Sequence, residues 1–351
     1  MTRKPTGDLR SGWTTGACAT AAVKAGLMAL WGDGFPREVE IVLPRGETPV
    51  FPIAHQDRGH GWTEVGITKD AGDDPDVTHG ALIVVRVTAS ANGIVFKAGE
   101  GVGTVTKAGL PISIGEPAIN PVPREMMRAV VAEMASVYGV SDDVDITVSV
   151  PGGAEIALKT WNPRLGIKGG LSILGTTGIV RPFSCAAWIS SIHRGVDVAR
   201  ASGQAHVAGC TGATSERVVQ KMFALPDHAM LDMGDFSGGL LKYLRNHPVP
   251  RVTIGGGVGK ITKLAQGAVD LHSSRSQVDF EALNVVAARL ALVDVSGANT
   301  ALDAIEIAGR GLAQEIAVIA KSVVESQLKG SDIAIDIVVV DRAGAVLGHA
   351  F

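Results

Sequence analysis

Aromatic side chains are scarce in this sequence, since tryptophan, tyrosine and phenylalanine make up only 4% of its 351 residues. Stacking of bases on aromatic rings is a common way to hold single-stranded nucleic acid. Runs of lysine and arginine are also missing, and the formal net charge is −3. Because nucleic-acid binding depends on neutralising phosphates with clustered cations, we expect no nucleic-acid partner.

Cysteines are few, and long apolar runs are absent. Cys18, Cys185 and Cys210 lie far apart without a CxxC pair, which excludes a thiolate zinc site of ordinary spacing and fits a reducing cytosol. No window reaches the roughly 18 to 20 apolar residues of a membrane helix, so no membrane partner is expected. The apolar segment Ala17–Leu30 contains Lys24 and lacks a convincing cleavage site. We interpret it as an amphipathic helix of a cytoplasmic protein, not as a signal peptide.

Glycine, in contrast, is abundant. It supplies 44 of the 351 residues, about 12.5% against a background of roughly 7%. The glycines follow no three-residue period, which excludes collagen. The length and an apolar fraction of 46% predict about two globular domains.

The first half is predicted to be α+β with a largely antiparallel sheet. Helices are expected at about Gly16–Trp31 and Pro123–Tyr138, the second with proline at its start. Runs rich in β-formers and bounded by turn residues predict strands. These runs are Glu38–Leu43, Thr48–Ile53, Trp62–Thr68, Ala81–Thr88, Gly93–Lys97, Val144–Val150 and Glu155–Lys159.

The second half repeats a strand–loop–helix pattern, which predicts parallel strands joined by right-handed crossovers. Strands are expected at Gln204–Gly209, Ala229–Met233 and Arg251–Ile254, followed later by helical regions at Phe280–Val293 and Thr300–Leu328. We place an α+β domain at residues 1–165 and an α/β domain at 166–351. Terminal hairpin strands within 333–349 could complete either sheet.

Small residues at the ends of the three predicted strands indicate a ligand-binding edge. In an open parallel sheet, ligands bind at the carboxyl ends of the strands. These ends lead into Cys210–Glu216, Gly234–Gly239 and Gly255–Lys260. Each loop opens a helix whose N–H groups can bind an anion, although such residues are also ordinary helix caps. The three loops together favour a ligand site.

The segment GGGVGK fails the common phosphate-binding patterns. Ile254 and Ile261 stand where a P-loop needs glycine and serine or threonine, and Lys260 interrupts the dinucleotide pattern. The G-x-G-x-G spacing after a strand resembles the first motif of common S-adenosylmethionine methyltransferases. Its glycines are Gly255, Gly257 and Gly259.

An acidic segment in the first half offers proton-transfer chemistry. Lys69–His79 packs four carboxylates beside one histidine. Crowded carboxylates raise one another's pKa and can then accept a proton near neutral pH. Two alternatives stay open, a hard-cation site whose spacing is not that of an EF-hand, and a solvated turn. In the N-terminal motif, Thr14 or Thr15 would cap the first helix.

These motifs, in this order, resemble the cobalt-precorrin-5B C1-methyltransferases of the CbiD type, a family of corrin-ring biosynthesis. The resemblance extends over nearly the whole chain. Its segments are Leu9–Ala22, Lys69–Gly80, Gly99–Leu110, Glu116–Arg124, Asn162–Pro182, Thr211–Glu216, Met233–Gly239 and Gly255–Ser273.

The resemblance implies methyl transfer from S-adenosylmethionine to ring carbon C1 of cobalt-precorrin-5B, giving cobalt-precorrin-6A. Transfer from a sulfonium to carbon needs an in-line approach, so positioning should supply much of the acceleration. The reduced macrocycle is itself the nucleophile. A base would help to remove a proton as the double bonds of the ring rearrange, and our candidates are Asp73, Asp74 and His79.

The resemblance also implies binding residues. Arginine and lysine in the polar, glycine-rich motifs should meet the acetate and propionate carboxylates of the substrate. The expected substrate contacts are Thr14, Thr15, Arg10, Lys107, Arg124, Arg164, Lys168 and Arg181. The expected cofactor contacts are Gly255, Gly257, Gly259, Thr211, Ser215 and Asp235. We expect no metal site, and a homo-oligomer is allowed.

Two other classes of protein stay open. One is a non-catalytic protein that binds a corrinoid or a nucleotide. The other is a reductase or kinase-like enzyme with a nucleotide at the glycine-rich edge, against which the failed phosphate-binding spacings argue. The scarcity of aromatic residues further predicts that polar loops and aliphatic side chains hold the ring.

Overall fold

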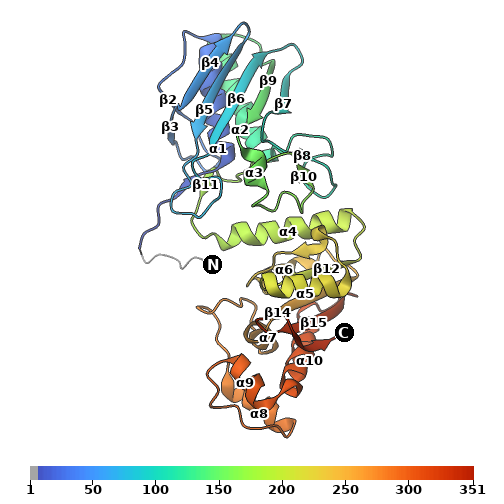
Figure 1. Cartoon of the computed structure of the whole chain (residues 1–351). Helices are drawn as coiled ribbons and strands as arrows, with labels where there is room; N and C mark the ends of the chain where they lie inside the picture. The colour runs from blue at the N-terminus through green and yellow to red at the C-terminus, as the bar shows by residue number, and fades with distance from the viewer. Residues whose placement is uncertain (1–6) are drawn as a thin grey trace. The chain divides into compact units, whose positions relative to one another are not determined.

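The computed structural model describes residues 7–351, and the chain forms two compact units, Met1–Ser184 and Cys185–Phe351 (Figure 1). Each unit has its own core, because each of the two large clusters of buried side chains draws its members from one unit. The stretch 166–184, which we placed with the second half, lies in the first unit. Its strands β10 (Ile167–Lys168) and β11 (Ile179–Val180) both pair with strands of that unit.

A five-stranded sheet forms the centre of the first unit. Its strands are β4 His55–Gly59, β5 Trp62–Thr68, β6 Leu82–Ala89, β7 Ile94–Ala98 and β9 Val144–Ser149. They lie in the order β4-β5-β6-β9-β7, and all neighbours are antiparallel except β9 and β7. The α+β expectation for this half is confirmed.

The two faces of this sheet differ in polarity. Val65, Val85 and Val148 lie side by side on one face and are fully buried. Glu64 and Arg86 are paired on the opposite face, where the Arg86 Nε donates to the Glu64 carboxylate at 3.0 Å. This alternation is typical of a sheet with one packed and one solvated face.

Two helices cover the buried face, α1 (Thr15–Trp31) and α2 (Pro121–Tyr138) (Figure 1). The amphipathic character expected for the first helix is wrong, because α1 is buried along nearly its whole length. Its many alanines and glycines allow this close packing. At Gly26, for example, the carbonyl accepts a hydrogen bond of 2.7 Å from Thr63 Oγ1 of β5.

Shorter elements complete the first unit. They are β1 Gly12–Trp13, β2 Glu38–Glu40, β3 Val50–Pro52, β8 Thr104–Val105 and α3 Gly153–Ala157. Antiparallel pairs form between β1 and β11, β2 and β3, and β8 and β10. The strand predicted at Glu155–Lys159 is wrong. Gly152, at a φ of 72°, turns the chain directly into α3, so no hairpin forms there.

The second unit is built on a sheet of mainly parallel strands. They are β12 His206–Cys210, β13 Met230–Leu231, β14 Arg251–Gly257, β15 Ala334–Val340 and β16 Val346–Ala350. The order is β13-β12-β14-β15-β16, and only β16 runs antiparallel to its neighbour. The predicted α/β class is therefore confirmed, and the terminal hairpin completes this sheet.

Helices lie on both faces of the second sheet. They are α4 Cys185–Ala201, α5 Ala213–Phe223, α6 Ser237–Leu244, α7 Val258–Ala265, α8 Phe280–Arg289, α9 Ala301–Ala308 and α10 Arg310–Gln327, with a 3-10 turn η1 at Asp227–Ala229. Gly255 faces Val219 of α5, whereas Gly209 and Gly348, on the opposite face of the sheet, meet α6 and α10. The long helical region predicted at Thr300–Leu328 is divided at Gly309, whose φ is 83°.

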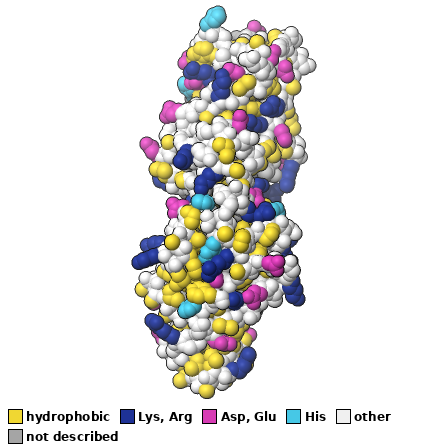
Figure 2. Space-filling model, turned by 90° about the vertical axis from the view of Figure 1, so that its right-hand side faces the viewer, with side chains coloured by type: hydrophobic (Ala, Val, Ile, Leu, Met, Phe, Trp, Pro, Cys, Tyr) yellow, Lys and Arg dark blue, Asp and Glu magenta, His cyan; other side chains and the backbone are white. Residues whose placement is uncertain are grey.

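The surface carries charges of both signs. Figure 2 shows lysine, arginine and carboxylate side chains interspersed over one face of the first unit. In the same view hydrophobic side chains gather over the second unit. Val285 and Val293 of that unit are each more than half exposed. No helix in the described part of the chain is long and apolar enough to span a bilayer.

Candidate functional site

The N-terminal motif and the acidic segment 69–80 pack backbone against backbone in the first unit. Trp13 N donates to the Asp70 carbonyl at 2.7 Å. A Cβ atom added to Gly12 would lie 2.1 Å from the backbone of that segment, and one added to Gly72 would lie 2.1 Å from the Arg10 carbonyl. Glycine at both positions is therefore required by the contact between two parts of the chain, and not by a ligand.

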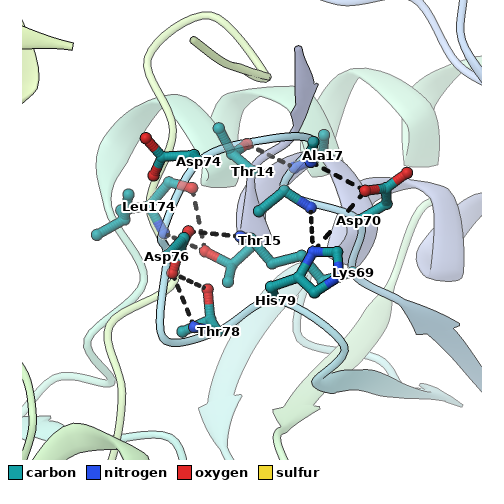
Figure 3. Close-up of polar contacts among 12 residues, drawn as sticks. Thr14, Thr15, Ala17, Lys69, Asp70, Asp74, Asp76, Thr78, His79 and Leu174 are labelled. Carbon is teal, nitrogen blue, oxygen red and sulfur yellow. Dashed lines mark hydrogen bonds and ion pairs between the residues drawn. The ribbon is translucent and has the colours of Figure 1, made fainter. Parts of the chain in front are cut away.

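A buried ion pair closes the acidic segment (Figure 3). Lys69 is only 2% exposed, and its Nζ lies 2.6 Å from Asp76 Oδ2. The other oxygen of Asp76 accepts from the backbone N–H and the hydroxyl of Thr78, at 2.8 and 2.6 Å. Burial raises the pKa of Asp76, but the Lys69 charge and these hydrogen bonds outweigh it and lower that pKa overall. The segment is held closed around a fully paired carboxylate.

Arg10 and Asp70 form a second ion pair at the same place. The guanidinium donates to both carboxylate oxygens, with Nη2 to Oδ1 at 2.9 Å. This contact and a hydrogen bond from Gly72 N lower the pKa of Asp70 to about 2. The mutual pKa elevation that we expected from crowding is wrong for Asp70 and Asp76, because each carboxylate has a cation and N–H donors beside it. Arg10 has its charge balanced within the protein.

The predicted bases Asp73 and Asp74 differ in solvent exposure. The Asp74 side chain is half-buried, and its Oδ1 accepts from Phe183 N at 2.8 Å. Asp73 is exposed, and its Oδ2 accepts from Arg10 N at 2.7 Å. The second oxygen of each carboxylate has no hydrogen bond within the described part of the chain. Asp74 is thus the less exposed of the two carboxylates, and one of its oxygens is available to accept a proton. It lies at the edge of the cluster, away from His79 (Figure 3).

His79 is placed as a donor. Its Nδ1 accepts a hydrogen bond of 3.1 Å from Ala71 N, so the lone pair of that nitrogen is occupied (Figure 3). A neutral imidazole with this arrangement carries its proton on Nε2, which is assigned from the hydrogen bond. The ring is about half exposed, and Asp70 Oδ1 lies 3.8 Å from Nδ1. This geometry fits donation to a ligand better than removal of a proton.

The threonines of the N-terminal motif both have partners in the fold. Thr14 Oγ1 accepts from Ala17 N at 3.2 Å and caps α1, as the sequence predicts. The Thr15 hydroxyl accepts from Leu174 N at 3.0 Å and donates to the Leu174 carbonyl at 3.2 Å (Figure 3). Both side chains are nearly fully buried. They tie the start of α1 to the glycine-rich stretch 166–178.

The predicted substrate cations fall into two groups. Arg124 is committed to the fold, since it donates to Glu116 at 3.2 Å and to two backbone carbonyls at 2.8 and 3.1 Å. Arg164 stacks over the ring of Trp161, 5.4 Å from the centroid.

Lys107 and Lys168 form the second group. Burial lowers the pKa of Lys107, and the nearby charge of Lys168 lowers it further.

Arg181 lines an open cavity of about 510 Å³ in the first unit. The N-terminal motif supplies Leu9, Ser11 and Trp13 to its wall, and the strand β11 supplies Ile179. Pro182, the residue after Arg181, also belongs to its wall. The cavity therefore offers a place where a ligand anion could reach a guanidinium.

The predicted cofactor residues surround the topological switch point of the second sheet. Strand order reverses between β12 and β14, and such a point opens a crevice outside the carboxyl ends of the strands. Thr211 N donates to the Gly255 carbonyl at 2.9 Å, so the two loops lie side by side. Neither α5 nor α7, which begin at these loops, has a side-chain cap at its N-terminus. Their first N–H groups are available to an anion.

The glycines of this edge are not equivalent. A Cβ on Gly255 would lie 2.6 Å from the Val219 side chain, so this glycine serves packing. A Cβ on Gly257 would meet nothing closer than 4.0 Å, and Gly259 and Gly212 face open space. Gly257, Gly259 and Gly212 thus leave room for a ligand to approach the backbone, as Gly255 does not.

Ser215 and Asp235 are engaged within the second unit. The Ser215 hydroxyl donates to the Gly212 carbonyl at 2.9 Å at the start of α5. Asp235 is 4% exposed and accepts from Lys260 Nζ at 2.6 Å, and the same ammonium donates to the Leu271 carbonyl. Lys260 therefore links the loop after β13 to the start of α7.

Comparison with known proteins agrees with these motifs. A sequence model described as CbiD matches residues 2–182, and one described as the CbiD C-terminal domain matches residues 270–351. The chain belongs to the CbiD family. A relative from Paramagnetospirillum magneticum, named cobalt-precorrin-5B C(1)-methyltransferase, is 57% identical over 97% of this chain and 98% of its own length. One of the same name from Brucella anthropi is 57% identical over 97% and 96%.

A solved structure described as a cobalamin biosynthesis protein (cbiD) from Archaeoglobus fulgidus is also similar. It shares 28% identity, with a TM-score of 0.42, and the alignment covers 72% of this chain and 78% of that one. The two matched CbiD regions leave out residues 183–269, which hold β12, β14 and the loops of the switch point. The relatives, in contrast, align over nearly the whole chain, this segment included.

Sequence reasoning missed two lysines of this CbiD chain. Lys69 directly precedes the acidic run, and its pairing with Asp76 follows from the need to neutralise a buried carboxylate. Lys260 was used only to reject phosphate-binding motifs, although a lysine at the first turn of a helix can reach a neighbouring loop. Within residues 7–351, no group of three His, Cys, Asp or Glu side chains could hold a metal ion.

Proposed function

We propose that this chain transfers a methyl group to ring carbon C1 of cobalt-precorrin-5B, with S-adenosylmethionine as the donor. The observation that carries the proposal is 57% identity over 97% of the chain to relatives that bear this activity in their names. The local geometry supports it, because the second unit places glycine-rich loops and two uncapped helix N-termini at the switch point of its sheet, and the first unit supplies a base candidate and cations.

The donor is assigned to the switch point of the second unit. Its carboxylate would accept from the uncapped N–H groups of α5 or α7, because a helix N-terminus favours anions. Gly257 and Gly259 would let the nucleoside approach the backbone, and the Thr211 hydroxyl lies beside Gly256 of β14. Gly255, Ser215 and Asp235 would shape the crevice from behind, because each already has a partner in the fold.

The acceptor chemistry is assigned to the first unit. S-adenosylmethionine, when bound, would supply the methyl group to the electron-rich ring, with its S–C bond breaking as the new C–C bond forms and S-adenosylhomocysteine as the product. Asp74 would take the proton released as the double bonds of the ring rearrange, through the oxygen that Phe183 N does not occupy. His79 would donate from Nε2 to an oxygen of the ring substituents. Asp73 is a weaker base candidate because its side chain is more exposed.

Arg181, Lys107 and Lys168 are the proposed contacts of the ring carboxylates. Arg10, Arg124 and Arg164 would act chiefly by holding the surrounding loops, since each is paired or stacked within the protein. Thr14 and Thr15 would likewise position the motif through the cap of α1 and the contact with Leu174.

Single-turnover methyl transfer tests the proposal. Purified protein is mixed with methyl-labelled S-adenosylmethionine and cobalt-precorrin-5B, and the tetrapyrrole is separated and counted. Label in the tetrapyrrole, with a mass gain of one methylene, is the expected result. Tight binding of both compounds without any transfer would instead support a non-catalytic corrinoid-binding protein.

The variant Asp74→Asn tests the assigned base. Asparagine keeps the oxygen that accepts from Phe183 N, so the fold should persist while the single-turnover rate falls about 100-fold or more. Asp73→Asn is the matched control and should lose less than Asp74→Asn. Full rate in Asp74→Asn would remove Asp74 as a base while leaving the methyl transfer itself intact.

A further inference from the structure

Two lysines from separate motifs come together in the first unit. The strand β8 (Thr104–Val105) pairs antiparallel with β10, and Lys168 lies opposite Thr104. The chain after β8 is fixed to the same segment, because Thr106 donates to the Gly166 carbonyl from its backbone N–H at 2.8 Å and from its hydroxyl at 2.6 Å. Lys107, the next residue, is therefore held beside the turn that leads into β10.

The aliphatic part of the Lys107 side chain packs directly against Gly166. Gly166 has a φ of +75°, and a Cβ there would lie 2.4 Å from Cγ and 2.7 Å from Cβ of Lys107. Any larger residue at 166 would push the lysine away, so the aliphatic stem is positioned by packing. The side chain is half-buried, whereas Lys168 is exposed.

The two ammonium groups lack a counter-charge. Burial, and then the charge of Lys168, lower the pKa of Lys107. Within the described part of the chain, neither lysine has a carboxylate or a hydrogen-bond acceptor as partner. Partial burial of the Lys107 ammonium near the charge of Lys168 costs stability, and an anion bound beside both lysines would offset that cost. Residues that destabilise a fold in this way are typical of binding sites.

We propose that Lys107 and Lys168 form a subsite for one carboxylate of the tetrapyrrole, each ammonium donating to one carboxylate oxygen. The proposal rests on the function proposed above, which supplies a ring with several acetate and propionate groups. The methyl donor also carries a carboxylate, so the shared chemistry is a carboxylate and the source must be separated by experiment. We assign the tetrapyrrole, because it carries several acetate and propionate groups whereas the donor carries a single carboxylate.

Equilibrium binding to the full-length protein tests the subsite. Uroporphyrin serves as the probe, since it carries acetate and propionate groups on a tetrapyrrole but is not the methyl acceptor. Lys107→Gln and Lys168→Gln should each weaken binding by about tenfold, because each removes a hydrogen bond to a charged group. Lys168→Arg should retain most of the affinity, and the exposed Lys159→Gln is the matched control without effect.

Three further measurements separate this subsite from a structural role. The affinity for uroporphyrin should depend less on salt in the double variant, which combines Lys107→Gln with Lys168→Gln, than in the wild type. The midpoint of urea unfolding should not fall in either variant, since a repulsion is removed. S-adenosylhomocysteine affinity should stay constant, and a loss there without a loss for uroporphyrin would overturn the assignment to the tetrapyrrole.

The outcomes also distinguish the two proposals. A wild-type protein that binds uroporphyrin through these lysines but transfers no methyl group contradicts the proposed function and leaves the subsite standing. A double variant that binds uroporphyrin and cobalt-precorrin-5B as tightly as the wild type overturns the subsite, whatever the methyl transfer shows. Absence of binding of either tetrapyrrole by the wild type overturns it as well.

Discussion

At the scale of single residues, the space beside each glycine distinguishes glycines required for chain packing from glycines that leave room for a ligand. Composition alone does not distinguish them. Gly12, Gly72 and Gly255 stand where two parts of the chain meet too closely for a Cβ atom. Gly257 and Gly259 stand where a Cβ would fit. Gly255, which was expected to contact the cofactor, is therefore a packing position, and this could not be read from the spacing of the glycines.

Alanine substitution tests this division at the predicted cofactor edge. Gly257 has a φ of −67°, so Gly257→Ala should fold with nearly unchanged stability and weaken S-adenosylhomocysteine binding by about tenfold or more. Gly255→Ala should cost about 1–3 kcal/mol of unfolding free energy, because its Cβ would overlap Val219. Titration calorimetry and urea unfolding measure the two effects. Equal affinity in Gly257→Ala would contradict the donor site.

His206 gives the second unit a pH dependence of stability. Its Nε2 lies 2.7 Å from Thr253 Oγ1, which donates to the buried Asp336. Burial and the charge of Arg251 lower the pKa of His206 below its ordinary 6.5. The charge of Asp336 acts in the opposite direction but does not outweigh them. The unfolded chain then binds more protons below about pH 6.5, so stability should fall as the pH drops from 7 to 5.

Denaturant unfolding at several pH values measures this effect. His206→Gln should flatten the dependence between pH 7 and pH 5, because the glutamine amide does not titrate. His60→Gln, which changes an exposed histidine, should keep the wild-type slope. An unchanged slope in His206→Gln would place the dependence elsewhere.

The candidate site could be predicted from the sequence only in part. The structure brings together Lys69 and Asp76 of the segment Lys69–His79, and it places the loops after β12 and β14 side by side. The sequence singled out these segments because their residue types are unusual together. The partners were not predictable. Arg10 and Asp70 are 60 residues apart in the chain, and only the fold reveals that they neutralise each other. Thr15 and Leu174 are likewise 159 residues apart.

At the scale of elements, α1 depends on its N-cap more than an ordinary surface helix does. Thr14 Oγ1 accepts from Ala17 N in a buried setting, where water cannot replace it. Thr14→Ala should therefore cost about 1–2 kcal/mol, the upper part of the range for such caps. Thr14→Ser keeps the oxygen and should lose less, measured by urea unfolding. Equal losses of unfolding free energy in both variants would show that the effect comes from the Thr14 methyl group, which packs on Gly175.

Elements were predicted well where a pattern is local. The strands β5, β6, β7 and β9 and the helix α2 follow from runs of β-formers or from helical spacing, and they lie within a few residues of their expected bounds. The polar edge strand β4 was missed, because its sequence HQDRG has no apolar alternation. The helix α4 was not anticipated either, since it follows a glycine-rich stretch without a clear start signal.

At the scale of the whole molecule, the two units have separate cores and assigned ligands of different kinds. A ligand stabilises the part that it binds, by RT ln(1 + [L]/Kd), which is about 2.7 kcal/mol at a hundredfold excess over Kd. Hydrogen exchange reports such stabilisation segment by segment. The separate cores therefore make the two assignments independently testable in one intact chain.

Hydrogen exchange followed by mass spectrometry should show two distinct footprints. S-adenosylhomocysteine should slow exchange in residues 210–216 and 255–260, because backbone N–H groups at the starts of α5 and α7 would be bonded to it. Uroporphyrin should slow exchange in the first unit, around 104–107 and 166–168, where Lys107 and Lys168 lie. Gly257→Ala is the control that should weaken the first footprint at the same ligand concentration and keep the second. Protection by S-adenosylhomocysteine confined to residues 7–184 would show that the donor site is wrongly assigned, since the loops after β12 and β14 belong to the second unit.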